Sequence, residues 1–167
     1  MKACIYAILA VLAASGGSPT LDAWSYFSSM VGRKIDAKRL SPLFEKYGSP
    51  AIVNVSGSAF TWDLERGGIS IKCADQHVIE IILQIAPGKR ISDVTYSGSL
   101  PDKVIECRVS PEKAIEILGK PQKDITHGYR QLTYSLEGVL MTLYYGPSLD
   151  FVSFSPIKAE QDAAANP

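Results

Sequence analysis

The sequence has no excess of charge of either sign. Seventeen Lys and Arg residues balance 17 Asp and Glu residues, which gives a formal net charge of +0 at pH 7. Proteins that bind nucleic acids use cationic side chains to neutralise phosphates. Because the chain contains no basic block, we do not expect a nucleic acid partner.

Residues that bind metals or attack substrates are also scarce. The chain has three Cys residues and two His residues, His77 and His127, and it contains no Cys-x-x-Cys or His-x-x-x-His pair. A structural zinc site takes four such ligands. A Gly-x-Ser-x-Gly elbow and a glycine-rich phosphate loop are both absent. The sequence therefore predicts no metal site, no cofactor and no enzymatic activity.

The long apolar run of this chain lies at the N-terminus. Lys2 precedes the 12-residue run ACIYAILAVLAA, and the small residues SGGSP follow it. This order is typical of a secretory signal peptide, and the run is short for a membrane span. We expect cleavage within Ala13–Gly17 and a periplasmic or secreted protein without stable membrane insertion. A buried first helix is the alternative.

Export would change the number of cysteines, because it removes Cys4 and leaves Cys73 and Cys107. Two cysteines in an oxidising compartment can form one disulfide. The bond would close 107 − 73 = 34 residues. In the chain-entropy model such a loop is worth roughly 3–4 kcal/mol. Two buried thiols that never meet are the alternative.

A signal that ends a helix occurs twice. The stretches LFEKYGSP at residues 43–50 and IEILGKP at residues 115–121 place apolar residues at helical spacing before Gly, one further residue, and Pro. Gly takes the left-handed cap and Pro cannot continue the helix. Ser41-Pro42 and Ser110-Pro111 would open the two helices, since Pro suits the first helical position.

Alternating residues follow each helix end. AFTWDLERGGISIKC at 59–73 indicates two strands with a turn between them, and HVIEIILQI at 77–85 indicates a third. LTYSLEGVLMTLYYG at 132–146 repeats the hairpin at an offset of 72 residues, and FVSF at 151–154 corresponds to VIEI. ISDVTYSG at 91–98 could form a further strand.

These patterns predict an α+β fold. We expect two tandem α-β-β-β units that form one antiparallel sheet with the helices packed on one face, because joining the units edge to edge removes two sheet edges. The expected divisions are a signal peptide at 1–16, an N-terminal helix at 20–32, a first unit at 33–96, a second unit at 97–156 and a flexible tail at 157–167.

The repeated helix and meander carry a resemblance to known families. A small exported chain of this build resembles the β-lactamase inhibitory proteins and, more distantly, the small outer-membrane assembly lipoproteins. YSGSLPDKVIECRVSPEKAIEILGKP at 96–121 also resembles bacterial proteins of this build that include the toxin-immunity type. The similarity covers most of residues 30–156. It implies a protein-binding role and names no target.

The alternation along the strands assigns residues to the two sheet faces. Trp62 and Tyr134 would point toward the helices. The opposite face would hold Ser70, Val78, Glu80 and Thr142 beside a set of larger side chains, and exposed apolar clusters on a sheet are typical of contact surfaces. The expected partner-binding residues are Tyr144, Leu140, Phe151, Lys72 and Ile82. The alternative is that the first helix, residues 91–98 or a second copy covers this face.

We therefore expect an exported protein-binding module. It would be an inhibitor or immunity protein that blocks a toxin, an enzyme or an envelope component through its open sheet face. A structural envelope-assembly protein without enzymatic activity is the alternative. One tight stoichiometric partner would favour the first function, and a constitutive membrane complex would favour the second.

Overall fold

The computed structural model describes residues 24–64, 66–87, 94–101, 110–136 and 138–157. The helices are Trp24–Ser28 (α2), Ala37–Tyr47 (α3) and Pro111–Leu118 (α5). The strands are Pro50–Ser56 (β1), Ala59–Leu64 (β2), Ile69–Ala74 (β3), His77–Gln84 (β4), Lys123–His127 (β5), Tyr129–Leu136 (β6), Val139–Tyr145 (β7) and Leu149–Pro156 (β8). In the described part of the chain, no helix is long and apolar enough to span a membrane.

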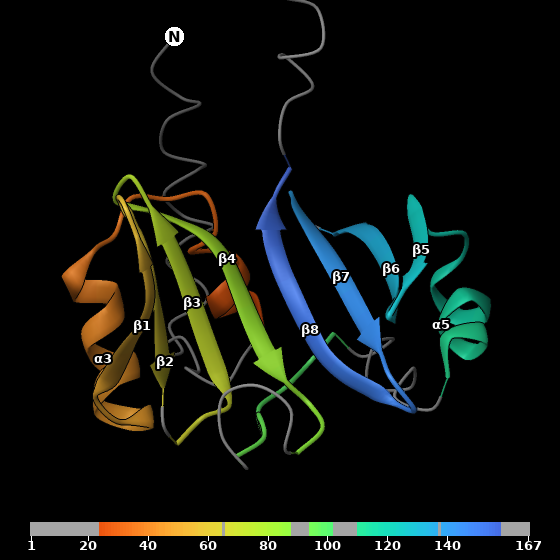
Figure 1. Cartoon of the computed structure of the whole chain (residues 1–167), viewed down its shortest axis with the longest axis horizontal. Coiled ribbons are helices and arrows are strands. Elements are labelled where there is room, and N and C mark those ends of the chain that lie inside the picture. The colour runs from red at the N-terminus through yellow and green to blue at the C-terminus, as the bar shows by residue number, and fades with distance from the viewer. Residues whose placement is uncertain (1–23, 65, 88–93, 102–109, 137, 158–167) are drawn as a thin grey trace, which may run out of the picture.

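The eight strands form one antiparallel sheet that runs across the molecule, with α3 near one end and α5 near the other (Figure 1). The strand order is β1-β2-β3-β4-β8-β7-β6-β5. Two groups of consecutive strands therefore meet at the centre, where Ile81 of β4 lies opposite Phe154 of β8. The expected α+β class and the antiparallel sheet are confirmed.

Each group contains four strands, whereas the sequence predicted three. The additional strands, β1 and β5, are the two edges of the sheet. β1 begins at Pro50, the residue that signals the end of the preceding helix, and an edge strand tolerates Pro because one of its sides makes no ladder hydrogen bonds. β5 is exposed along its whole length, so its sequence lacks the alternation that marks a half-buried strand.

The two helix starts differ in how well the sequence predicted them. Ser110 caps α5 by accepting a hydrogen bond from the Lys113 N–H, and Pro111 is the first helical residue, as expected. In α3 the cap is Asp36, whose carboxylate accepts from the Lys38 N–H at 2.9 Å, so Pro42 lies inside the helix and the predicted start was wrong. An Asx cap outweighed the Ser-Pro pattern because it satisfies a free backbone donor.

The N-terminal helix is shorter than the predicted 20–32. α2 ends at Ser28, residues 29–32 continue as turns, and residues 20–23 lie outside the described chain. Gly32 adopts a positive φ of 77° and donates its N–H to the Val78 carbonyl at 2.7 Å. This bond ties the end of the N-terminal segment to β4.

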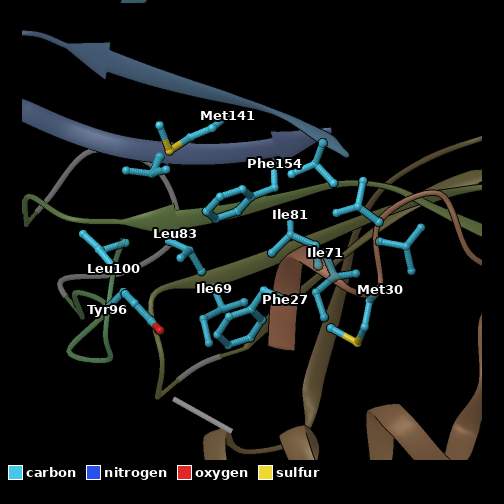
Figure 2. Close-up of a cluster of buried hydrophobic side chains, with 14 of the residues drawn as sticks. Phe27, Met30, Ile69, Ile71, Ile81, Leu83, Tyr96, Leu100, Met141 and Phe154 are labelled. Carbon is cyan, nitrogen blue, oxygen red and sulfur yellow. The ribbon is translucent and has the colours of Figure 1, made fainter. Parts of the chain in front are cut away.

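The core lies on the helix side of the sheet. Figure 2 shows Phe27 and Met30, from α2 and the turn after it, beside the apolar side chains of β3 and β4. Phe27 and Phe154 are fully buried. The buried side chains of all three helices belong to this one cluster. Within the described ranges, these helices therefore leave the other sheet face uncovered.

Residues 94–98 form no strand, which corrects the expectation for ISDVTYSG; residues 91–93 lie outside the described chain. The segment is nevertheless tied to the sheet, because the Tyr96 N–H donates to the Gln84 carbonyl at 2.7 Å. The Tyr96 ring packs edge-on against Phe27 with centroids 5.7 Å apart. The segment passes so close to Gly68 that a Cβ there would lie 2.7 Å from the Tyr96 nitrogen.

Two irregular pairings change which side chains enter the core. The β3–β4 register shifts between Lys72 and Cys73, so Val78 pairs with Cys73 and lies in the core. Val78 was expected on the open face, and that assignment was wrong because strict alternation fails at a bulge. A second shift between Tyr144 and Tyr145 places Tyr145 in the core.

Candidate functional site

A row of small hydroxyl side chains crosses the open face of the sheet. The cross-strand pairs run Ser70–Ile82, Ile82–Ser153, Ser153–Thr142 and Thr142–Thr133. The Oγ1 atoms of Thr133 and Thr142 lie 3.1 Å apart, within hydrogen-bonding distance. We call these five residues the central row. Because four of them are small, the larger side chains on either side rise above them.

A hollow of about 250 Å³ lies on this face. Its lining comes from five adjacent strands, β3, β4, β8, β7 and β6. The lining residues are Lys72, Glu80, Ile82, Tyr129, Gln131, Tyr144 and Phe151. Such a mixture of an ion pair, aromatic rings and one aliphatic side chain can bind a group that is partly apolar and partly polar.

An aromatic cluster forms one rim of the hollow. Tyr144 of β7 and Phe151 of β8 form a cross-strand pair, with ring centroids 4.5 Å apart and an interplanar angle of 31°. The Tyr129 ring lies 5.8 Å from Phe151 on its other side. Phe151 is buried at 6% exposure, whereas Tyr144 and Tyr129 remain partly exposed. The two tyrosines therefore present ring surface to the hollow.

An ion pair forms the opposite rim. Lys72 of β3 and Glu80 of β4 are cross-strand partners, and the Lys72 Nζ donates to the Glu80 Oε2. Their side chains are 38% and 20% exposed. A partly exposed pair adds little to stability because solvent screens it. Its effect is to place a donor-rich and an acceptor-rich group at one end of the hollow without net charge.

The structure brings together four of the five predicted partner-binding residues. Tyr144, Phe151, Lys72 and Ile82 all line the hollow. Leu140 pairs with Ser135 and Ser155 on the same face and does not line it.

Three lining residues were missing from the predicted site. The alternation placed Glu80 on this face, and the same pattern, extended one residue before Leu132, would have added Gln131. Tyr129 follows Gly128 at the start of β6, where alternation carries little weight because only one side of the strand has been read. Its place in the hollow depends on its contact with Phe151, seven residues before the end of the described chain.

Trp62 and Tyr134 lie on the helix side, as expected. The Trp62 ring packs edge-on against Phe44 of α3, with centroids 5.6 Å apart, and against Phe60 at 4.9 Å. Trp62 is partly buried and Tyr134 is 8% exposed. Both side chains therefore contribute to packing between the sheet and its helices.

The cysteine and metal expectations have different outcomes. Cys73 is a buried, free thiol on the core side, and burial raises its pKa to about 11. Cys107 lies outside the described residues, so its pairing with Cys73 stays a prediction. Among the side chains that the structure describes, no group of three or more His, Cys, Asp and Glu residues could hold a metal ion.

Arg130 links the second helix to the edge of the sheet. Its guanidinium donates two hydrogen bonds to Asp124 of β5, at 3.1 and 3.0 Å, and a third to Glu112 of α5. The arginine contacts hold the pKa of Asp124 below its ordinary value, and a backbone hydrogen bond of Glu112 together with Arg130 does the same for Glu112. This network lies on the helix side, away from the hollow.

The comparisons with known proteins give little further information. No family model matches the chain, and no curated protein matches it. A crystal structure of a DUF4309 family protein, YjgB from Bacillus subtilis subsp. subtilis str. 168, is weakly similar. Its TM-score is 0.43 and its sequence identity 13%, over 70% of this chain and 77% of that chain. The proposals below therefore rest on the residues themselves.

Proposed function

We propose that this protein is an exported binding module that acts as an inhibitor or immunity protein and blocks a partner protein through its open sheet face. The observation that carries the proposal is the hollow, where Tyr144, Phe151, Lys72 and Ile82 converge from four strands. Tyrosine is enriched among the residues that dominate binding energy at protein interfaces. The resemblance to the β-lactamase inhibitory proteins supports the same role.

A duplicated architecture is part of this proposal. We infer that α3 with β1–β4 and α5 with β5–β8 derive from one repeated unit, each with its helix on the same side. The two bulges support this inference, because Lys72/Cys73 and Tyr144/Tyr145 are separated by the same 72 residues as the repeated hairpins. A repeat with one helix on each half leaves the opposite face uncovered over its whole width, which suits a broad contact surface.

Site-specific photo-crosslinking tests the binding face. A photoreactive phenylalanine analogue replaces Gln131 in one variant and Lys38 in another. Gln131 lines the hollow, whereas Lys38 is exposed on α3. We expect Gln131 to give one discrete adduct with an envelope or secreted protein and Lys38 to give none. Adducts at Lys38 alone, or no adduct at Gln131, would contradict the proposal.

A further inference from the structure

We propose that the hollow binds the side chain of a tyrosine presented on a loop of the partner protein. This inference rests on the proposed function, since it names the chemical group that the same surface recognises. It follows from the size of the hollow, from the neutral ion pair at one rim and from the aromatic cluster at the other.

The size of the hollow suits one side chain. Its volume of about 250 Å³ lies below the roughly 300–1,000 Å³ that is usual for small-molecule sites. Interfaces between proteins often place a single large anchor residue in such a depression. The two rims lie on opposite sides of the central row, four residues apart along a strand, or about 14 Å. Long side chains lean in from both rims, which leaves room for one ring above Ile82.

The ion pair selects a neutral polar group. An ammonium carries three N–H donors and a carboxylate about four lone-pair sites, so the bond between Lys72 and Glu80 leaves both groups with capacity for further hydrogen bonds. A phenolic hydroxyl both donates and accepts, so it can bond to this pair without breaking it. An incoming arginine would place a second cation beside Lys72. An incoming carboxylate would place a second anion beside Glu80.

The opposite rim selects an aromatic body. Tyr144 and Tyr129 present ring surface, and aromatic rings prefer tilted or edge-to-face contacts with other rings. A sugar would need partners for several hydroxyl groups around its ring. On the aromatic side of the hollow the lining offers few of them besides Gln131. A single hydroxyl at one end of an aromatic ring therefore matches this lining better than a sugar does.

NMR titration of the isotope-labelled protein with small probes tests the inference. The probes are N-acetyl-L-tyrosinamide, its phenylalanine and arginine counterparts, and a methyl glucoside. We expect the tyrosine probe to bind in the millimolar range and to shift the backbone signals of Lys72, Glu80, Ile82 and Tyr144. One neutral hydrogen bond favours tyrosine over phenylalanine by roughly threefold to tenfold. Equal binding of these two probes, stronger binding of arginine or the glucoside, or no binding would each overturn it.

A double variant identifies the source of the preference. Lys72→Met with Glu80→Met removes the ion pair without changing the net charge, so tyrosine and phenylalanine should then bind equally. Lys113→Met with Glu116→Met removes a similar but exposed pair on α5 and should keep the preference. A preference that survives the first change would overturn the assigned role of the ion pair. Crosslinking at Gln131 without any tyrosine preference would reject this inference and retain the proposed function.

Discussion

Tyr144 and Phe151 lie face to face on neighbouring strands, 4.5 Å apart between ring centroids, on a sheet face that α2, α3 and α5 leave uncovered. Trp62 and Phe44 make a comparable contact on the other face, at 5.6 Å, where a helix meets the sheet. Similar aromatic contacts thus occupy two different environments. The first remains available to a partner, whereas the second holds elements of the fold together.

The two environments predict opposite phenotypes for two alanine variants. Tyr144→Ala should lower the free energy of unfolding by only about 1–2 kcal/mol, because the ring is partly exposed and loses one aromatic contact. It should reduce partner affinity by at least ~2 kcal/mol, some thirtyfold. Trp62→Ala should cost about 2–3 kcal/mol of stability, since the ring is only partly buried. Thermal melts and titration calorimetry with the crosslinked partner measure both effects; the reverse order would show that the sheet faces are misassigned.

Gly68 should be far less tolerant of substitution than Gly57. Both adopt a positive φ, 59° and 60°, so alanine strains both backbones equally, by about 1–2 kcal/mol. At Gly68 the added Cβ would also lie 2.7 Å from the Tyr96 backbone nitrogen, whereas at Gly57 no atom lies within 4 Å. We expect Gly68→Ala to destabilise the protein by at least about 1–3 kcal/mol more than Gly57→Ala in urea denaturation. Equal losses would mean that residues 94–96 do not pack as described.

The Arg130 network should make stability depend on acid pH. The pKa values of Asp124 and Glu112 are lowered in the folded protein, so their stabilisation is present above their ordinary values of 3.8 and 4.5 and is lost as the pH falls through the lower folded values. Arg130→Gln removes the main cause of the Asp124 shift and a secondary cause of the Glu112 shift. Its stability should therefore decline less steeply below pH 4.5 than that of the wild type. Lys113→Gln is the control, and an unchanged slope in Arg130→Gln would reject the network.

The disulfide between Cys73 and Cys107 remains a prediction. Protein prepared from an oxidising compartment should show no free thiol when it is titrated in denaturant without reductant. If the protein is instead prepared fully reduced, native Cys73 should react slowly with thiol reagents at pH 8, because it is buried and its pKa is raised to about 11. Two free thiols in the oxidised preparation would show that the cysteines do not pair.

Export predicts a new N-terminus. Intact-mass measurement of the protein from an exporting host should place the first residue between residues 14 and 18, because the small residues after the apolar run suit signal peptidase. A variant with Leu9→Arg and Leu12→Arg in the apolar run should remain unprocessed. Mature protein that retains Met1 would contradict the prediction.

Local patterns in the sequence determined much of the fold. Gly-x-Pro stops marked the ends of α3 and α5, and alternation identified β2, β3, β4, β6, β7 and β8 together with the side chains that face the helices. These features depend on residues close together in the chain, so periodicity and capping chemistry reveal them. The same alternation placed Tyr144, Lys72 and Ile82 on the open face.

The tertiary structure decided what depends on pairing between distant residues. The bulge at Lys72 and Cys73 moved Val78 into the core, and neither strand's own alternation shows where a register will shift. β1 and β5 are strands because a neighbour offers hydrogen bonds, not because their own side chains alternate. The pairing of β4 with β8 joins the two halves, and only that pairing brings Lys72 and Glu80 to the same hollow as Tyr144 and Phe151.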